Sequence, residues 1–275
     1  MLSDEDLTRY RRDGFVVLRA VMDAKHVAAC IAALGRLAEE PGAPGRAFVA
    51  LEAAADAQAE AVDRVRKFGN FTETDAALMK AAMNPRLHHA LDELMGRGRV
   101  MLQEMALVKP PRIGGEKPWH QDAAYFRGSD PSLMFGVWIA LDPATTENGC
   151  MELIPGSHRA GLVPHIPHPD INLCTIDPRY VHPEQRVAVP LDPGDALVFS
   201  SLAHHYTAAN RSGLRRRALQ FHYHQVGLEW TSLEAHRALY HDDAGEYAGC
   251  TVSRGKPFRE ESSFLPSPLR PVVMA

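Results

Sequence analysis

The sequence has few cysteines and no cysteine cluster. The four cysteines, Cys30, Cys150, Cys174 and Cys250, are scattered through 275 residues, and no two have the CxxC spacing of a zinc site. This pattern is typical of free thiols in a reducing compartment and argues against a zinc ion bound by cysteine. We therefore expect a cytoplasmic protein with unpaired cysteines.

Long hydrophobic runs and an excess of one charge are also missing. No apolar stretch approaches the roughly 18 residues that a membrane span requires. The charged N-terminus, MLSDEDLTRYRRDGFVVLRAV, lacks the apolar core of a signal peptide. The formal net charge is -4, so no overall field attracts nucleic acid or an anionic membrane. We expect a protein that binds neither nucleic acid nor membrane.

The predicted helices come early and the strands follow. Hydrophobic residues make up 45% of the chain, enough for a large core. Helical spacing predicts helices over 3–13, with Ser3 or Asp4 as N-cap, over 24–40 after Asp23, and over 74–96. Apolar, β-branched runs predict strands over 15–21, 99–109, 133–142 and 216–226, and two short strands on either side of Pro193-Gly194-Asp195.

This order of elements predicts an α+β fold, a double-sheet jelly roll with helices packed on one sheet. We expect one domain over 1–275, with a jelly-roll core at about 99–226, helical support over 1–98 and an irregular C-terminal segment over 227–275. The segment 41–45, PGAPG, is expected to end the second helix.

Two connections have distinctive sequences. Asn148-Gly149 between apolar segments predicts a type I′ hairpin, because both central residues of that turn need positive φ. The segment 155–186 is rich in proline and histidine and has no periodicity, so it is expected to be a long loop that could act as a lid. We expect its histidines to lie at the surface or to support the ligands of a metal site, and not to be ligands themselves. These histidines are His158, His165, His168 and His182.

The stretch Trp119-His120-Gln121-Asp122 contains a candidate metal site. Alternate residues of a strand share a face, so His120 and Asp122 would project together while Gln121 faces away. Two histidines and one carboxylate are the ligands of non-haem Fe(II) oxygenases, so one further histidine is needed. The alternative is a polar pair on an exposed edge strand.

The second histidine could come from His204 or His205, which follow an apolar strand. Neighbours on a strand face opposite sides, so only one of them can join the pair. Eleven residues after His205, Arg216 begins another strand, and its forked donors suit a carboxylate. Alternation places Arg215 and Arg217 on the other face from Arg216, which argues against a solvated basic patch.

Several separated stretches, in order, resemble the phytanoyl-CoA dioxygenase family of Fe(II)/2-oxoglutarate oxygenases. They are VKPPRIGGEKPWHQDAAYF, VWIALDPATTENGCMELIPGSH, PGDALVF, and HYTAANRS followed by RRAL. The resemblance runs from DGFVVLRAV to HYH. It implies a double-stranded β-helix that uses Fe(II), 2-oxoglutarate and O₂ to hydroxylate a C–H bond of a small molecule, with release of succinate and CO₂.

The resemblance also implies roles for individual residues. The iron ligands would be His120, Asp122 and His205, since the family's motif of histidine, any residue, serine or threonine, two residues and asparagine matches His205, Thr207 and Asn210. Arg216 and Thr207 would bind the tail carboxylate of 2-oxoglutarate. Trp138, Met105 and Gln103 are expected around this co-substrate, although each could simply pack in the core. A further basic contact is expected from Arg64, Arg66 or Lys67.

Other readings remain open. Related halogenases have a small residue at the position of Asp122, so its carboxylate favours hydroxylation, but members of the same family also desaturate or cyclise. A non-catalytic cupin-like binding protein is a second possibility, and a zinc hydrolase would leave Arg216 and Thr207 without a role. His222 and His224 share a face with Arg216 and could line a substrate pocket or pack in the core. Tyr125, Phe126 and Arg127 could contact substrate, and Arg127 would suit an anionic one.

Overall fold

Two antiparallel sheets face each other in the computed structural model, which describes residues 2–39, 47–126, 128–168, 173–239, 241 and 244–245. The larger sheet has the order β1 (Phe15–Leu18), β11 (Ala196–Ser200), β6 (Met134–Ala140), β13 (Arg216–Gln225), β4 (Arg99–Lys109), β3 (Val65–Gly69) and β2 (Phe48–Leu51). The smaller sheet has the order β10 (Val187–Val189), β7 (Met151–Leu153), β12 (His205–Thr207) and β5 (Lys117–His120). This is the predicted jelly roll, and β1, β2 and β3 join its larger sheet from the segment 1–98.

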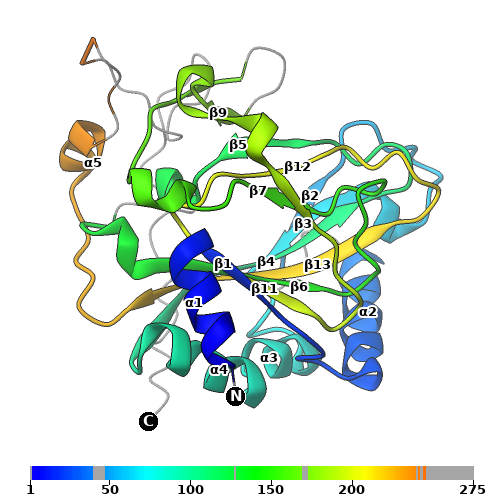
Figure 1. Ribbon diagram of the computed structural model, residues 1–275. Helices are drawn as coiled ribbons and strands as arrows, with labels where there is room; N and C mark the ends of the chain where they lie inside the picture. The colour runs from blue at the N-terminus through cyan, green and yellow to red at the C-terminus, as the bar shows by residue number, and fades with distance from the viewer. Residues whose placement is uncertain are drawn as a thin grey trace.

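Three helices lie along one side of the larger sheet: α2 (Ala24–Glu39), α3 (Ala76–Ala82) and α4 (Pro85–Met95) (Figure 1). The helix α1 (Asp4–Asp13) packs beside the edge strand β1 and contacts α4, and a short α5 (Leu233–Leu239) follows the last strand. Ser3 caps α1 through a capping box, and the Asp23 carboxylate accepts a hydrogen bond of 2.7 Å from the backbone of His26 at the start of α2. Among the described helices, none is long and apolar enough to cross a membrane.

The helical region predicted over 74–96 is two helices, not one. Pro85 lacks a backbone N–H, and the Asn84 side chain caps α4 by accepting from the backbone of Arg86 and Leu87. A new helix therefore starts at Pro85, and the chain bends before it.

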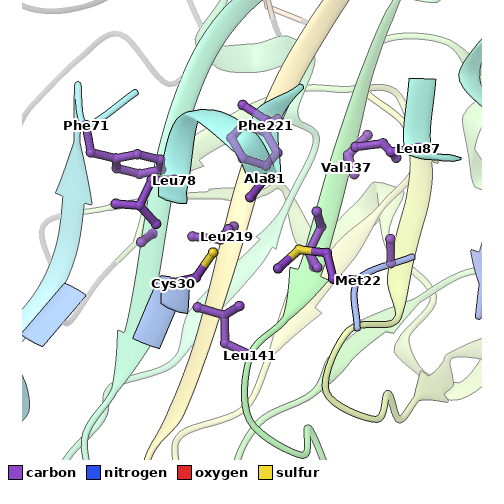
Figure 2. Packing of buried hydrophobic residues seen from close by; sticks show 14 of the residues in the cluster. Met22, Cys30, Phe71, Leu78, Ala81, Leu87, Val137, Leu141, Leu219 and Phe221 are labelled. Carbon is purple, nitrogen blue, oxygen red and sulfur yellow. The ribbon is translucent and has the colours of Figure 1, made fainter. Parts of the chain in front are cut away.

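The layer between the helices and the larger sheet is the main hydrophobic core. Leu219 and Phe221 of β13 pack there against Leu78 of α3 and Cys30 of α2 (Figure 2). Because successive strand residues alternate between faces, burial of the odd-numbered residues of β13 under the helices turns its even-numbered residues, from Arg216 onward, toward the smaller sheet.

The Asn148-Gly149 pair does not form the predicted hairpin. Gly149 has a φ of 81°, but among described non-glycine residues positive φ occurs at Ala20, Asn70 and Arg112 and not at Asn148. The Asn148 side chain instead accepts from the backbone of Thr145 and donates to Pro143, at 2.8 Å each. β6 before the turn belongs to the larger sheet and β7 after it to the smaller one, so the chain crosses between sheets here.

Two other expectations need correction. Within 155–186, β8 (His165–Pro167) pairs with β9 (Cys174–Ile176), so this segment is not simply a loop. Cys30 and Cys150 are free thiols as expected, but Cys174 is disulfide-bonded. Spacing in the sequence reveals a CxxC site but not a disulfide, which depends on proximity in the folded chain. Cys250 and the segment 41–45 lie outside the described residues.

Candidate metal centre

The side chains of His120, Asp122 and His205 meet at one buried point between the sheets. One ligand atom from each lies within 4.8 Å of the other two. The Nε2 atoms of His120 and His205 are each 3.5 Å from Oδ1 of Asp122, and the two imidazole centroids are 4.0 Å apart. None of the three residues is more than 4% exposed. This arrangement could hold a metal ion, and the predicted set of three residues is brought together.

Strand pairing brings the two histidines together, and a change in backbone conformation brings in the carboxylate. His205 of β12 lies opposite His120 of β5. Contrary to the expectation of one continuous strand, β5 ends at His120 and a 3₁₀ helix, η2 (Asp122–Tyr125), begins at Asp122. Gln121 between them faces away, and its buried amide donates to the carbonyls of Gly161 and Leu202 at 2.8 Å. These long-range hydrogen bonds end the strand and orient the aspartate.

Hydrogen bonds to the backbone set the tautomers of both histidines. Nδ1 of His120 lies 2.7 Å from the carbonyl of Pro118, and Nδ1 of His205 lies 2.9 Å from the carbonyl of Ala203. A carbonyl oxygen can only accept, so each Nδ1 is protonated and each Nε2 presents its lone pair to the cluster. Burial holds the pKa of His120 well below its usual value, which keeps this imidazole neutral and able to bind a metal.

The carboxylate of Asp122 is ionised. Burial alone would raise the pKa of this carboxyl, but the neighbouring imidazoles, His222 first among them, hold it well below its usual range. Metal binding requires neutral histidine ligands, so the ionised carboxylate would then leave a negative charge in a buried site, which a divalent cation would balance. The donor set therefore fits the Fe(II) ion that the sequence predicts.

Side chains behind the ligands support them. His222 donates from Nε2 to Oδ2 of Asp122 at 2.9 Å. His165 is fully buried, and its Nε2 accepts the backbone N–H of Gln121 at 3.0 Å. The ring of Phe199 packs against His205 with centroids 4.9 Å apart. Sequence reasoning placed His222 on the correct face but missed its bond to Asp122, and no local signal links His165 to Gln121, 44 residues away.

His204, the alternative to His205, lies outside the ligand cluster. The apolar strand β11 ends at Ser200, and His205 is the first residue of β12, so the two histidines do not end an apolar strand as expected. The backbone N–H of His204 donates to Ser157 at 2.9 Å. Only His205 shares the cluster with His120 and Asp122.

Arg216 is a buried cation without a partner among the described residues. It is 2% exposed, its guanidinium carbon lies 5.2 Å from the ring centre of Trp138, and its Nε and Nη1 make no hydrogen bond with described atoms. Burial lowers the pKa of Arg216 to about 10. A buried charge is costly unless it is paired, so this fork fits a carboxylate that the protein itself does not supply.

The neighbouring arginines are paired with acids. Arg217 binds Asp142 through two hydrogen bonds, of 2.7 and 2.6 Å, and Arg215 binds Asp63 and Glu60. The three consecutive arginines are therefore not a free basic patch, as strand alternation predicted.

The remaining candidates of the larger sheet, Trp138, Met105 and Gln103, lie on the same inner face as Arg216, whereas Thr207 belongs to the smaller sheet. Gln220, four residues along β13, lies opposite Met105 of β4 and Trp138 of β6. His222 lies opposite Gln103. Thr207 follows His205 on β12 and is 8% exposed.

The three basic candidates of the segment 64–67 now differ. Lys67 of β3 lies opposite Leu107 of β4, which in turn lies opposite Ala218 of β13, two residues from Arg216 and on its face. Directly paired strand residues point to the same side of a sheet, so Lys67 faces the smaller sheet. Arg66 is exposed. Lys67 therefore has the best position for a contact in this space.

The loop from β12 to β13 sets the distance from His205 to Arg216, and hydrogen bonds from Asn210 fix the conformation of this loop. The Asn210 amide donates to the carbonyls of Lys109, Pro110 and Leu214, at 2.7 to 3.1 Å. The asparagine of the motif is thus structural. Arg127, a candidate for substrate contact, lies outside the described residues.

Comparisons with known proteins agree with this geometry. Residues 10–218 match the family model for phytanoyl-CoA dioxygenase (PhyH). The chain is 32% identical over 166 residues to phytanoyl-CoA dioxygenase 1 of Oryza sativa subsp. japonica, which is 58% of this chain but only 57% of the rice protein. It is 26% identical over 261 residues to phytanoyl-CoA dioxygenase domain-containing protein 1 of Danio rerio, covering 81% of this chain and 90% of the zebrafish one.

Solved structures have the same fold. EvdO2 from Micromonospora carbonacea var. aurantiaca, complexed with 2-oxoglutarate, is 26% identical with a TM-score of 0.66, over 84% of this chain and 94% of EvdO2. SnoK, a non-heme alpha ketoglutarate dependent carbocyclase from nogalamycin biosynthesis, is 25% identical with a TM-score of 0.67, over 83% and 86% of the two chains. EctD from S. alaskensis with bound Fe, at 22% identity and a TM-score of 0.66 over 84% and 79%, supports the fold alone.

Proposed function

This chain belongs to the phytanoyl-CoA dioxygenase family, and we propose that it is an Fe(II)- and 2-oxoglutarate-dependent dioxygenase that hydroxylates a C–H bond of a small molecule. His120, Asp122 and His205 hold the iron. The main support is the combination of this buried cluster with a buried guanidinium, Arg216, that has no partner among the described residues. A zinc hydrolase using the same ligands would have no use for such a guanidinium.

The co-substrate site extends from the cluster to Arg216. Arg216 binds the tail carboxylate of 2-oxoglutarate through its fork, and Thr207 donates its hydroxyl to the same group. The ring of Trp138 packs beside the guanidinium, and Met105 and Gln103 line the β4 side. Lys67 supplies the further basic contact. The co-crystal structure of EvdO2 with 2-oxoglutarate supports this co-substrate, because that protein has the same fold at 26% identity.

Iron and 2-oxoglutarate, when bound, supply the activation of O₂, and succinate and CO₂ are the co-products. The protein positions the ligands, keeps both Nε2 atoms free of protons and excludes water from the buried cluster. The carboxylate of Asp122 fills the position that related halogenases leave for chloride, which favours hydroxylation. SnoK, at 25% identity, is a carbocyclase, so cyclisation is the second candidate reaction.

The catalytic unit is proposed to be one domain over 1–275, since strands from both ends of the described chain, β1 and β13, belong to the same sheet. A cytoplasmic location is also proposed. The free thiols of Cys30 and Cys150 support it, while the disulfide at Cys174 argues against it.

Anaerobic addition of Fe(II) and then 2-oxoglutarate tests the proposal. We expect a visible metal-to-ligand charge-transfer band in the wild-type protein, and succinate formation once O₂ and a substrate are added. The band should be lost in His205→Asn and retained in His204→Asn, which changes the neighbouring histidine outside the cluster. Absence of the band in the wild-type protein would leave a binding protein of the same fold as the better explanation.

A further inference from the structure

A lysine and a tyrosine lie beside the metal cluster at the edge of the smaller sheet. Lys117 is the first residue of β5 and lies opposite Thr207. Its Nζ donates to the hydroxyl of Tyr125 and lies 4.5 Å from the centre of the Tyr125 ring. The same ring meets His120 edge-on, with centroids 5.8 Å apart. Tyr125 therefore fixes the ammonium group of Lys117 next to a metal ligand.

Lys117 has no acidic partner within the described part of the chain. It forms no ion pair there, and burial raises the pKa of the Tyr125 hydroxyl, so that group stays neutral. The nearby carboxylate of Asp122 already faces both ligand histidines and His222. The pKa of Lys117 is lowered to about 8, first by burial and also by Arg66, although Asp122 opposes the shift. The positive charge of Lys117 is therefore poorly balanced by negative groups of the protein.

Other positive groups face the same region. Lys67 of β3 also has no acidic partner among the described residues, and its Nζ lies 5.7 Å from the ring centre of Phe48. Its pKa is lowered by burial, by Arg66 and by Lys117, so the charges of the two lysines repel each other. Lys117, Tyr125 and Lys67 are partly exposed, unlike the metal ligands. The approach to the cluster is therefore positively charged and can be reached from solvent.

The co-substrate does not account for all of this charge. The guanidinium of Arg216 is placed by Trp138, whereas the ammonium group of Lys117 is placed by Tyr125 beside His120. The tail carboxylate of 2-oxoglutarate is assigned to Arg216, and its other end to the metal. Lys117 is left for a second anion that lies close to the metal at the same time as the co-substrate.

We propose that Lys117, positioned by Tyr125, binds an anionic group of the primary substrate, a carboxylate or a phosphate, and so restricts the enzyme to small organic anions. This assignment rests on the proposed function, because it requires the metal and 2-oxoglutarate to occupy their own sites. A charge-assisted hydrogen bond from Lys117 would then hold the substrate beside the metal ligands.

Competitive acetylation of lysines, quantified by peptide mass spectrometry, tests the assignment without a known substrate. The protein is loaded with Zn(II), which does not support catalytic turnover, and is saturated with 2-oxoglutarate. Calorimetry checks that 2-oxoglutarate binds. Acetate and inorganic phosphate are the anionic probes, acetamide is the neutral probe, and the exposed Lys25 of α2 is the internal control. We expect Lys117 to remain reactive with 2-oxoglutarate alone and to be protected by acetate or phosphate but not by acetamide.

The protecting anion distinguishes a carboxylate from a phosphate substrate. If 2-oxoglutarate alone protects Lys117, the lysine serves the co-substrate, and the assignment is wrong while the proposed function stands. If calorimetry shows no binding of 2-oxoglutarate, the proposed function fails first. If 2-oxoglutarate binds and neither anion protects Lys117, the assignment alone is overturned.

Variants provide a second measurement. In the protein loaded with Zn(II) and 2-oxoglutarate, the binding of acetate or phosphate is measured by thermal shift. Lys117→Gln should weaken this binding about tenfold, which is the loss expected for one charge-assisted hydrogen bond. Lys117→Arg should retain binding, and Lys25→Gln should match the wild type. Should Lys117→Gln fail to fold, the acetylation experiment on the wild-type protein decides alone.

Discussion

His222 holds one oxygen of the Asp122 carboxylate and leaves the other to the metal site. Its Nε2 lies 2.9 Å from Oδ2, while Oδ1 lies 3.5 Å from Nε2 of both His120 and His205. The carboxylate is therefore oriented before any metal binds. Groups that orient a ligand in this way commonly contribute to metal affinity almost as much as the ligands do.

Replacing His222 should weaken metal binding although His222 is not a ligand. His222→Phe keeps a ring against Phe126, whose centroid is 5.1 Å away, but removes the donor to Asp122. We expect the Fe(II) affinity, measured anaerobically by competition with a chelator, to fall roughly 10- to 100-fold. His224→Phe is the matched control, since His224 lies on the same strand face and contacts Trp230 instead. Equal Fe(II) affinities for the two variants would show that the hydrogen bond has no such role.

Arg216→Lys should impair use of 2-oxoglutarate. Lysine keeps the positive charge but cannot present two parallel donors to a carboxylate. The KM for 2-oxoglutarate, measured as succinate formation, should rise about tenfold or more, equivalent to losing one charge-assisted hydrogen bond. Arg217→Lys, which changes the neighbouring residue bound to Asp142, should leave this KM unchanged. A normal KM in Arg216→Lys would mean that the tail carboxylate binds elsewhere.

Gly136→Ala should damage the metal centre through Phe199. A Cβ at residue 136 would lie 2.5 Å from the Phe199 ring, which packs against His205. Overpacking of this kind costs about 1–3 kcal/mol of folding free energy, and a displaced Phe199 would also move His205, so metal affinity should fall too.

Gly35→Ala is the control for that substitution. Gly35 lies inside α2, and the position where its Cβ would stand is open space. Alanine there should raise the free energy of unfolding by about 0.5–1 kcal/mol. Urea unfolding and metal titration of both variants measure the difference. If Gly136→Ala binds metal as tightly as Gly35→Ala, the Phe199 ring is not needed to position His205.

His165 should make the folded state sensitive to acid. Burial lowers its pKa from 6.5 to about 3, whereas the unfolded chain takes up the proton near the ordinary value. Its contribution to stability is therefore complete above about pH 6.5 and is lost as pH falls toward 3.

His165→Gln keeps an acceptor for the Gln121 N–H but cannot titrate. Between pH 6 and 4, its unfolding free energy should fall less steeply than that of the wild type, by up to about 1.4 kcal/mol per pH unit. Urea unfolding of the metal-free proteins at several pH values measures this slope. Parallel curves for the two proteins would mean that folding does not lower the pKa of His165.

Local periodicity in the sequence determined the elements and the orientation of their side chains. The strand predicted over 99–109 is β4 (Arg99–Lys109). Alternation correctly directed Arg216 inward and Arg215 and Arg217 to the opposite face, where the structure pairs them with acids. These predictions succeed because strand geometry repeats every two residues and a buried face selects apolar side chains. The resemblance to a family then indicated His205 rather than His204.

Tertiary structure alone decided how those faces meet. It ended β5 at His120, turned Asp122 into η2, and directed the chain after Asn148 into the other sheet. It also brought His165 behind Gln121 and placed Lys117 against Tyr125. The physical reason is that these contacts depend on strand pairing and on buried hydrogen bonds between residues far apart in the chain, which leave no periodic signal in the sequence.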